Sequence, residues 1–148
     1  MKPPPAGWPR ISSAIFYDDA GAAIDWLCRA FDFSVRLRIE GEGGRIEHSE
    51  LTFGEGLVMV GSGGEDPKRR VPYASPRSLG GANTQVLCVQ VEDVDAHHAR
   101  AMAAGAKVTR ALATTDYGSD YWTDRTYEAE DPEGHRWFFS QRLRNPGE

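Results

Sequence analysis

The spacing of apolar residues predicts two amphipathic helices. Over residues 20–31, apolar side chains recur at intervals of three and four and form one stripe of Ala20, Ile24, Leu27, Cys28 and Phe31. A similar stripe over 93–104 stops at Gly105. Acidic pairs, Asp18–Asp19 and Glu92–Asp93, precede both helices. Carboxylates are favoured there because they accept hydrogen bonds from unpaired amides and face the positive end of the helix dipole.

The order of predicted elements occurs twice along the chain. Each helix lies between two strands, and each copy ends in a hairpin. In the first copy RIEHSELTF turns at GEG into LVMVGS, and in the second YWTDRTYEAE turns at DPEG into HRWFFSQRL. Gly and Pro supply the backbone angles that such turns need. The sequence therefore predicts an α+β fold, in which duplicated β-α-β-β-β modules form a cupped eight-stranded mixed sheet around a cavity.

These modules divide the chain into four segments of one domain. Residues 1–9 form a flexible Pro-rich arm, 10–62 the first module, 63–83 a connecting loop and 84–142 the second module. A loop of this length without periodicity is typical of a functional lid or of disorder.

Composition and charge narrow the choice of compartment and partner. The chain has 148 residues, of which 40% are hydrophobic and 26% charged, with a formal net charge of −5. It contains no apolar run of about 18 residues and no apolar secretory leader, so we expect a cytoplasmic protein without a membrane partner. The acidic balance argues against a nucleic-acid partner. Cys28 and Cys88 lack the spacing of a metal or redox motif. Open sheet edges predict a homodimer.

The duplicated order, with DPEGH before the last strand, resembles the vicinal-oxygen-chelate superfamily. That superfamily contains glyoxalase, bleomycin-resistance proteins, fosfomycin-resistance enzymes and extradiol dioxygenases, and the resemblance covers residues 10–142. The stretches HSELTFGEGLVMVGS and YWTDRTYEAEDPEGHRWFF are most similar to the PhnB-like branch.

The resemblance also implies where a divalent metal would bind. Metal-using members take their ligands from the first and last strands of each module. Carried onto this chain, those positions are Ser12, Val60, Val86 (or its neighbour Gln85) and Phe138. Phe and Val have no metal-donor atom, whereas a divalent ion needs several converging donors. We therefore expect no metal ligands and no cofactor.

Strand alternation predicts which side chains line the cavity instead. With Phe138 facing inward, the third strand of the first module turns inward Ile46, His48, Glu50 and Thr52. The equivalent strand of the second module turns inward Trp122, Asp124, Thr126 and Glu128, unless a β-bulge exchanges that face for Tyr121, Arg125 and Tyr127. The predicted ligand-binding residues are Val60, Trp122, Asp124, Thr126, Glu128 and Phe138.

Two functions are compatible with this lining. A cavity with aromatic walls and carboxylates suits a small aromatic or cationic molecule, as in the drug-sequestering members of the superfamily. The alternative is a metal-independent lyase or isomerase, in which His48 and Glu50 serve as acid and base. A glyoxalase-like or dioxygenase-related activity, or a metal rebuilt from His48, Glu50 and Glu128, also stays open. His48 and Glu50 are equally consistent with an exposed strand pair, and Trp122 with a core or dimer contact.

Overall fold

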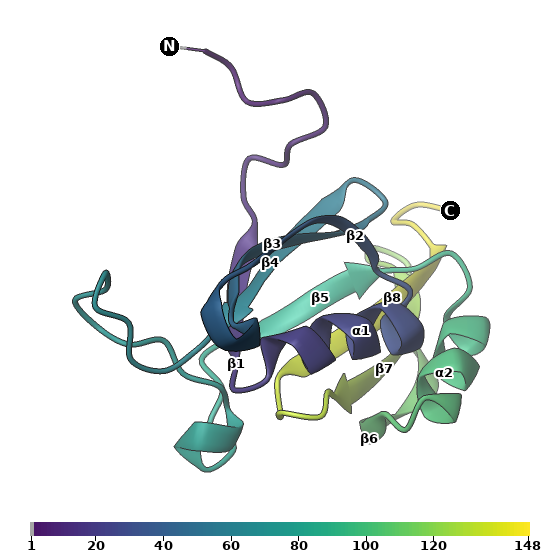
Figure 1. Ribbon diagram of the computed structural model, residues 1–148. Coiled ribbons are helices and arrows are strands. Elements are labelled where there is room, and N and C mark those ends of the chain that lie inside the picture. The colour runs from purple at the N-terminus through teal and green to yellow at the C-terminus, as the bar shows by residue number, and fades with distance from the viewer. Residues whose placement is uncertain (1) are drawn as a thin grey trace.

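The computed structural model describes residues 2–148 and contains two α-helices and eight strands (Figure 1). Two short 3₁₀ turns interrupt the loops at Glu42–Gly44 and Arg77–Leu79. The elements of the first module are β1 (Ser13–Tyr17), α1 (Ala20–Phe31), β2 (Ser34–Glu40), β3 (Ile46–Phe53) and β4 (Gly56–Ser62). Those of the second are β5 (Val86–Gln90), α2 (Val94–Ala103), β6 (Lys107–Asp116), β7 (Thr123–Glu130) and β8 (Arg136–Arg144).

The eight strands are divided between two four-stranded sheets. Their orders are β1-β4-β3-β2 and β5-β8-β7-β6. In each sheet the first strand runs parallel to the last strand of its module, and the other pairs are antiparallel. The predicted α+β fold with duplicated β-α-β-β-β modules is therefore confirmed, and β1 and β5 each keep one free edge.

The helices begin where the acidic pairs predicted. The carboxylate of Asp19 accepts a hydrogen bond from the backbone N–H of Ala22, and that of Asp93 accepts one from Ala96, each at 3.0 Å. These bonds satisfy amides that have no partner within the helix, which stabilises each helix by about 0.5–2 kcal/mol.

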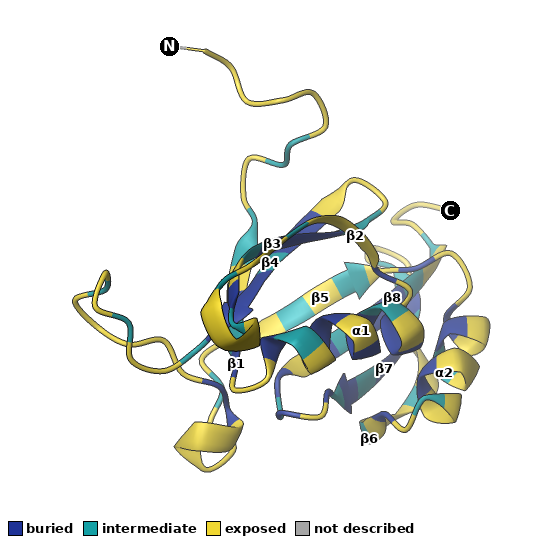
Figure 2. Cartoon of the chain, viewed as in Figure 1, coloured by how far each residue is buried: buried dark blue, intermediate teal, exposed yellow. Residues whose placement is uncertain are grey.

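A single aromatic core joins the two modules. Phe31, the last residue of α1, packs its ring against Phe139 and Trp137 of β8, with centroids 4.7 Å and 5.5 Å away. Trp26 donates its indole N–H to the carbonyl of Ala104, beyond the end of α2. Buried positions accordingly follow the faces that the sheets turn towards the helices (Figure 2). The helix of one module thus completes the core of the other.

The DPEGH turn between β7 and β8 makes a second connection between the modules. The buried carboxylate of Asp131 accepts hydrogen bonds from the Tyr17 hydroxyl at 2.6 Å and the Trp137 indole at 3.1 Å. Its other oxygen accepts the backbone N–H groups of Glu133 and His135. Burial, with the Asp131 charge, raises the pKa of Tyr17 well above its ordinary value, so the phenol stays a proton donor.

Glu133 and His135 extend this connection to the start of α1. The Glu133 carboxylate accepts the backbone N–H groups of Asp18 and Asp19 at 2.6 and 2.9 Å, and pairs with Arg77 at 3.2 Å. The His135 imidazole bonds through Nε2 to the carbonyl of Phe16 at 2.8 Å. We call Tyr17, Asp131, Glu133 and His135 the inter-module latch.

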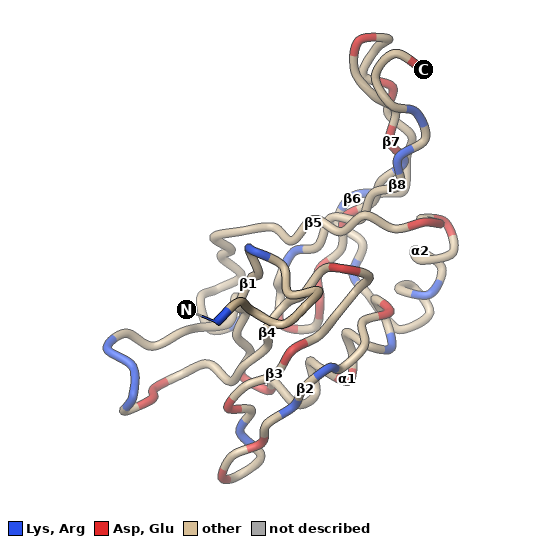
Figure 3. Tube along the Cα trace, turned by 90° about the horizontal axis from the view of Figure 1, so that it is seen from above, with Lys and Arg blue, Asp and Glu red and all other residues tan. Residues whose placement is uncertain are grey.

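The arm and the connecting loop leave the body of the molecule (Figure 1). Trp8 of the arm lies under the guanidinium of Arg36, 4.6 Å from its ring centroid. In the loop, Tyr73 stacks on Phe16 of β1 with centroids 4.1 Å apart, and Arg69 lies over both rings. Basic residues are spread along the chain with acidic ones between them (Figure 3). Within residues 2–148, no helix is long and apolar enough to cross a membrane.

Replacing Tyr17 with Phe should lower the free energy of unfolding by about 1–3 kcal/mol, because it removes a buried partner of an ionised carboxylate. Tyr121→Phe is the matched control, since Tyr121 is 57% exposed and its loss should change the free energy by less than about 0.5 kcal/mol. Urea unfolding of both variants measures this, and equal effects would show that the latch does not stabilise the fold.

Candidate ligand-binding groove

A cavity with a volume of about 1090 Å³ lies between the two modules. One wall is the β3–β4 hairpin of the first module, and the other is formed by β5 and the start of α2. Its surface is mainly apolar, with aromatic and aliphatic side chains that include Phe33, Phe53, Leu57, Leu87, Val89 and Trp137. Phe33 packs on both Phe53 and Trp137, with centroids 5.6 and 5.5 Å away. We call this cavity the inter-module groove.

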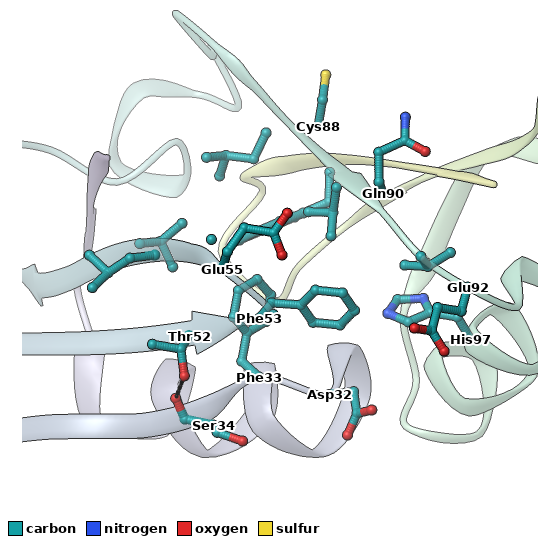
Figure 4. Close-up of a pocket in the computed structure, with 18 of the residues that line it drawn as sticks. Asp32, Phe33, Ser34, Thr52, Phe53, Glu55, Cys88, Gln90, Glu92 and His97 are labelled. Carbon is teal, nitrogen blue, oxygen red and sulfur yellow. Dashed lines mark hydrogen bonds between the residues drawn. The ribbon is translucent and has the colours of Figure 1, made fainter. Parts of the chain in front are cut away.

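The rim of the inter-module groove is acidic. Asp32 and Asp93 are already engaged, because Asp32 pairs with Arg100 at 2.7 Å and Asp93 caps α2. Glu55 at the hairpin tip and Glu92 after β5 have no ion-pair partner within residues 2–148. Figure 4 shows Glu55 extending from the hairpin towards β5, and Glu92 follows β5 on the other wall. The two free carboxylates therefore belong to opposite modules.

His97, at the floor of the groove, has a structural role. Its Nδ1 lies 2.7 Å from the Tyr127 hydroxyl and its Nε2 lies 3.1 Å from the carbonyl of Phe31. Burial lowers the pKa of His97, so the neutral ring accepts from the phenol and donates to the carbonyl. Because both nitrogens are engaged, the ring has no free nitrogen for a ligand.

His48 and Glu50 contact each other, but they lie outside the groove. His48 Nε2 is 3.0 Å from one oxygen of Glu50, and Arg36 donates to the other at 2.8 Å. These partners, His48 first and then Arg36, lower the pKa of Glu50. Glu50 is buried, whereas the His48 side chain is 40% exposed. Both belong to the sheet face opposite the helices, where Met59 lies across from Glu50.

The predicted residues of the second module share the corresponding face of the other sheet. Glu128 pairs directly with Phe138 across the β7–β8 ladder, and Thr126 and Asp124 follow at alternate positions. Tyr127 instead lies in the helix-facing core, so a bulge does not exchange the faces. None of these side chains, nor Trp122, lines the inter-module groove. The structure therefore does not bring the two predicted groups into that cavity.

On these open faces, arginine side chains form ion pairs that neutralise the charge of the carboxylates. Arg142 contacts Asp124 at 2.6 Å and lies over the Trp122 ring, 5.2 Å from its centroid. Arg136 lies 3.5 Å from Glu128. The negative charge predicted for this lining is thus largely neutralised by arginines, which strand alternation alone did not predict.

The predicted inward position of Val60 is wrong. Its side chain is 1% exposed and belongs to the helix-side core with Leu51, while Met59 occupies the open face. The prediction counted equal distances from Gly56 and Gly134. In the ladders, however, Val60 lies beside the buried Ile15 of β1, whereas Phe138 lies beside the exposed Cys88 of β5, so the two counts end on opposite faces.

The side chains present do not fit the superfamily's divalent metal. Phe138 and Val86 occupy two of the expected ligand positions and carry no donor atom, and Val60, expected at a third, lies in the core. Across residues 2–148, no three His, Cys, Asp or Glu side chains converge as a metal site requires. His48 and Glu50 lie on one sheet and Glu128 on the other, each carboxylate beside an arginine, so they do not form a rebuilt site either.

Comparison with known proteins agrees with this architecture. The model of the Glyoxalase/Bleomycin resistance protein/Dioxygenase superfamily matches residues 10–139, and the chain belongs to that family. An uncharacterized protein of Mycobacterium bovis is 35% identical over 138 residues, which cover 92% of this chain and 85% of the relative.

Two solved structures show the same fold. TioX from Micromonospora sp. ML1 is 34% identical with a TM-score of 0.68, over 90% of this chain and 95% of that one. A glyoxalase/bleomycin resistance protein/dioxygenase from Alicyclobacillus acidocaldarius is 15% identical with a TM-score of 0.60, over 90% of each chain. The latter likeness shows the fold alone.

The lowered pKa of Glu50 predicts a pH-dependent contribution to stability. An unfolded Glu titrates near about 4.3, and a lower folded pKa adds stability above that pH, which is lost as pH falls through the folded pKa. The difference in unfolding free energy between wild type and Glu50→Gln should therefore be largest at pH 7 and shrink below about pH 4. Glu47→Gln, an exposed position of the same strand, should show a small difference at every pH. A constant difference for Glu50→Gln would contradict the assignment.

Proposed function

We propose that the protein binds a small planar aromatic molecule carrying positive charge in the inter-module groove, without a metal or another cofactor. The observation that carries this proposal is the pair of free carboxylates, Glu55 and Glu92, on opposite walls above an aromatic and aliphatic surface. Protein ligand sites are typically apolar cavities of about 300–1,000 Å³ with a few polar groups that fix orientation, and this groove is of that size.

The physical basis is stacking combined with charge pairing. A planar ring packed on Phe53 or Phe33 gains apolar burial and edge or face contacts with aromatic rings. A cationic substituent then approaches Glu55 or Glu92, neither of which has an ion-pair partner within residues 2–148. Binding without chemical conversion is in keeping with the drug-sequestering members that the sequence resembles. The open-face residues Trp122, Asp124, Thr126, Glu128 and Phe138 stay a predicted site, and the test below separates the two locations.

A second function is favoured by the His48–Glu50 contact. A carboxylate 3.0 Å from Nε2 orients an imidazole and leaves Nδ1 free to accept a proton, which is the arrangement of a metal-independent lyase or isomerase. Arg36 keeps Glu50 ionised and fixed. We rank this function second because neither His48 nor Glu50 lines the large groove.

We propose a homodimer, because the open face of β2 exposes Leu37 and Ile39 to 39% and 46%, and no other part of residues 2–148 covers them. A cytoplasmic location and membership of the PhnB-like branch follow from the sequence alone. The chain's mass is 16.3 kDa. Light scattering at micromolar concentration should give about twice that value. A value near the chain mass would contradict the dimer.

Titration with a planar aromatic cation and an anion of the same ring size tests the binding site. The cation should bind more tightly, and Glu55→Gln and Glu92→Gln should each weaken it about two- to five-fold, as expected for exposed ion pairs worth about 0.4–1 kcal/mol. The matched controls Trp122→Ala and Glu128→Gln should leave binding unchanged, because both residues lie outside the groove.

Two results would contradict this proposal. If only the open-face variants weaken binding, the ligand occupies the site that the sequence predicted. If the bound compound is converted and His48→Asn abolishes the conversion, the lyase or isomerase function is correct. Calorimetry for affinity and NMR of the recovered compound together distinguish these cases.

A further inference from the structure

The free edge of β5 borders the inter-module groove. Within residues 2–148, β5 pairs only with β8, in parallel register, and the N–H of Val91 donates to the carbonyl of Ser140 at 2.9 Å. Backbone groups of a strand point alternately to its two sides. The backbone N–H and C=O groups of Val89 and Val91 point towards β8. Those of Cys88 and Gln90 therefore point to the opposite side, where no strand pairs with them within residues 2–148.

The lining of the groove shows that it runs along this edge. All six consecutive residues from Leu87 to Glu92 contribute to the groove, although neighbouring side chains of a strand point to opposite faces. Only a cavity beside the strand, in the plane of the sheet, meets both faces in this way. In Figure 4 the side chains of Cys88 and Gln90 leave β5 on the side away from Glu55, so the β5 backbone, and not these side chains, faces the hairpin.

We infer that the ligand of the groove is a short extended peptide with basic and aromatic side chains, which pairs with β5 as an added strand. This inference rests on the proposed function and adds the chemistry of the ligand's backbone. Strand addition takes affinity from main-chain hydrogen bonds and specificity from pockets for alternate side chains. Here the pockets are the Phe33–Phe53–Trp137 surface and the free carboxylates of Glu55 and Glu92.

The chain's own segments do not supply this strand. β1 lies nearest, and the Ser13 hydroxyl bonds to the Gln85 side chain at 3.1 Å, but no ladder joins β1 to β5. The arm before β1 contains Pro3, Pro4, Pro5 and Pro9, which lack the N–H that pairing needs, and it projects from the body (Figure 1). The five residues of β5 span about 17 Å, enough for a peptide of four or five residues.

Calorimetry with acetyl-Lys-Trp-Lys-Val-amide tests the inference, beside a planar aromatic cation that has no amide group. Gln90→Pro removes one of the two N–H groups, those of Cys88 and Gln90, that face the groove, and it keeps the bonds to β8. Compared with Gln90→Ala, which loses the same side chain but keeps the N–H, it should weaken peptide binding at least ten-fold, with no comparable effect on the planar cation. A melting temperature within a few degrees of wild type confirms that Gln90→Pro is folded.

Binding of two N-methylated peptides to the wild-type protein tests the inference without the Gln90→Pro variant. Each carries methyl groups on one of the two alternating sets of amides, and only one set faces β5, so one peptide should lose binding and the other keep it. Equal binding of both, with the cation still bound, overturns the inference and leaves the proposed function intact. Loss of all binding by peptide and cation overturns both. If Gln90→Pro halves the mass in light scattering, the edge pairs with a second copy of the chain, which also overturns the inference.

Discussion

The arrangement of the two modules depends on the buried carboxylate of Asp131. It receives four hydrogen bonds, of which the one from Tyr17 crosses from the first module to the second. Burying a carboxylate without such partners costs free energy, and a buried hydroxyl or indole N–H likewise needs an acceptor. Asp131 and its partners Tyr17 and Trp137 therefore stabilise one another. Glu133 adds a second constraint, because it satisfies the amides at the start of α1 and thereby fixes the helix that fills the shared core.

This constraint also explains why a groove is present. The latch holds β1 at its last residue, Tyr17, while the groove is lined by residues 11–13 at the opposite end of the same strand. Phe31 of α1 packs against Trp137 and Phe139 of β8 and fills the space between the helix and this strand. β1 and β5 each keep a free edge. The modules are therefore joined firmly at one end and separated at the other. The proposed ligand site follows from this geometry rather than from any single catalytic side chain.

Much of the fold could be predicted because local signals and long-range packing agree. The stripe over 20–31 matches α1, and the Gly-containing turns mark both hairpins. The site was less predictable for physical reasons. Strand alternation predicts which face a side chain occupies but not its ion-pair partner. It therefore did not predict that Arg36, Arg136 and Arg142 neutralise the carboxylates on these faces. Glu55 and Glu92 resembled ordinary residues of a turn and of a helix start. No feature of their local sequence indicates that they lie on opposite walls of one groove. The sequence did contain DPEGH, but its role appears only when Tyr17, 114 positions away, is placed beside it.

The most direct test of this account is a crystal structure of the protein with a planar aromatic cation bound. The account predicts density for the ring against Phe53 and Phe33, with its cationic group towards Glu55 or Glu92, and no change in the latch. Density between Trp122 and Phe138 on the open face of the second sheet, with the inter-module groove free of ligand, would contradict it.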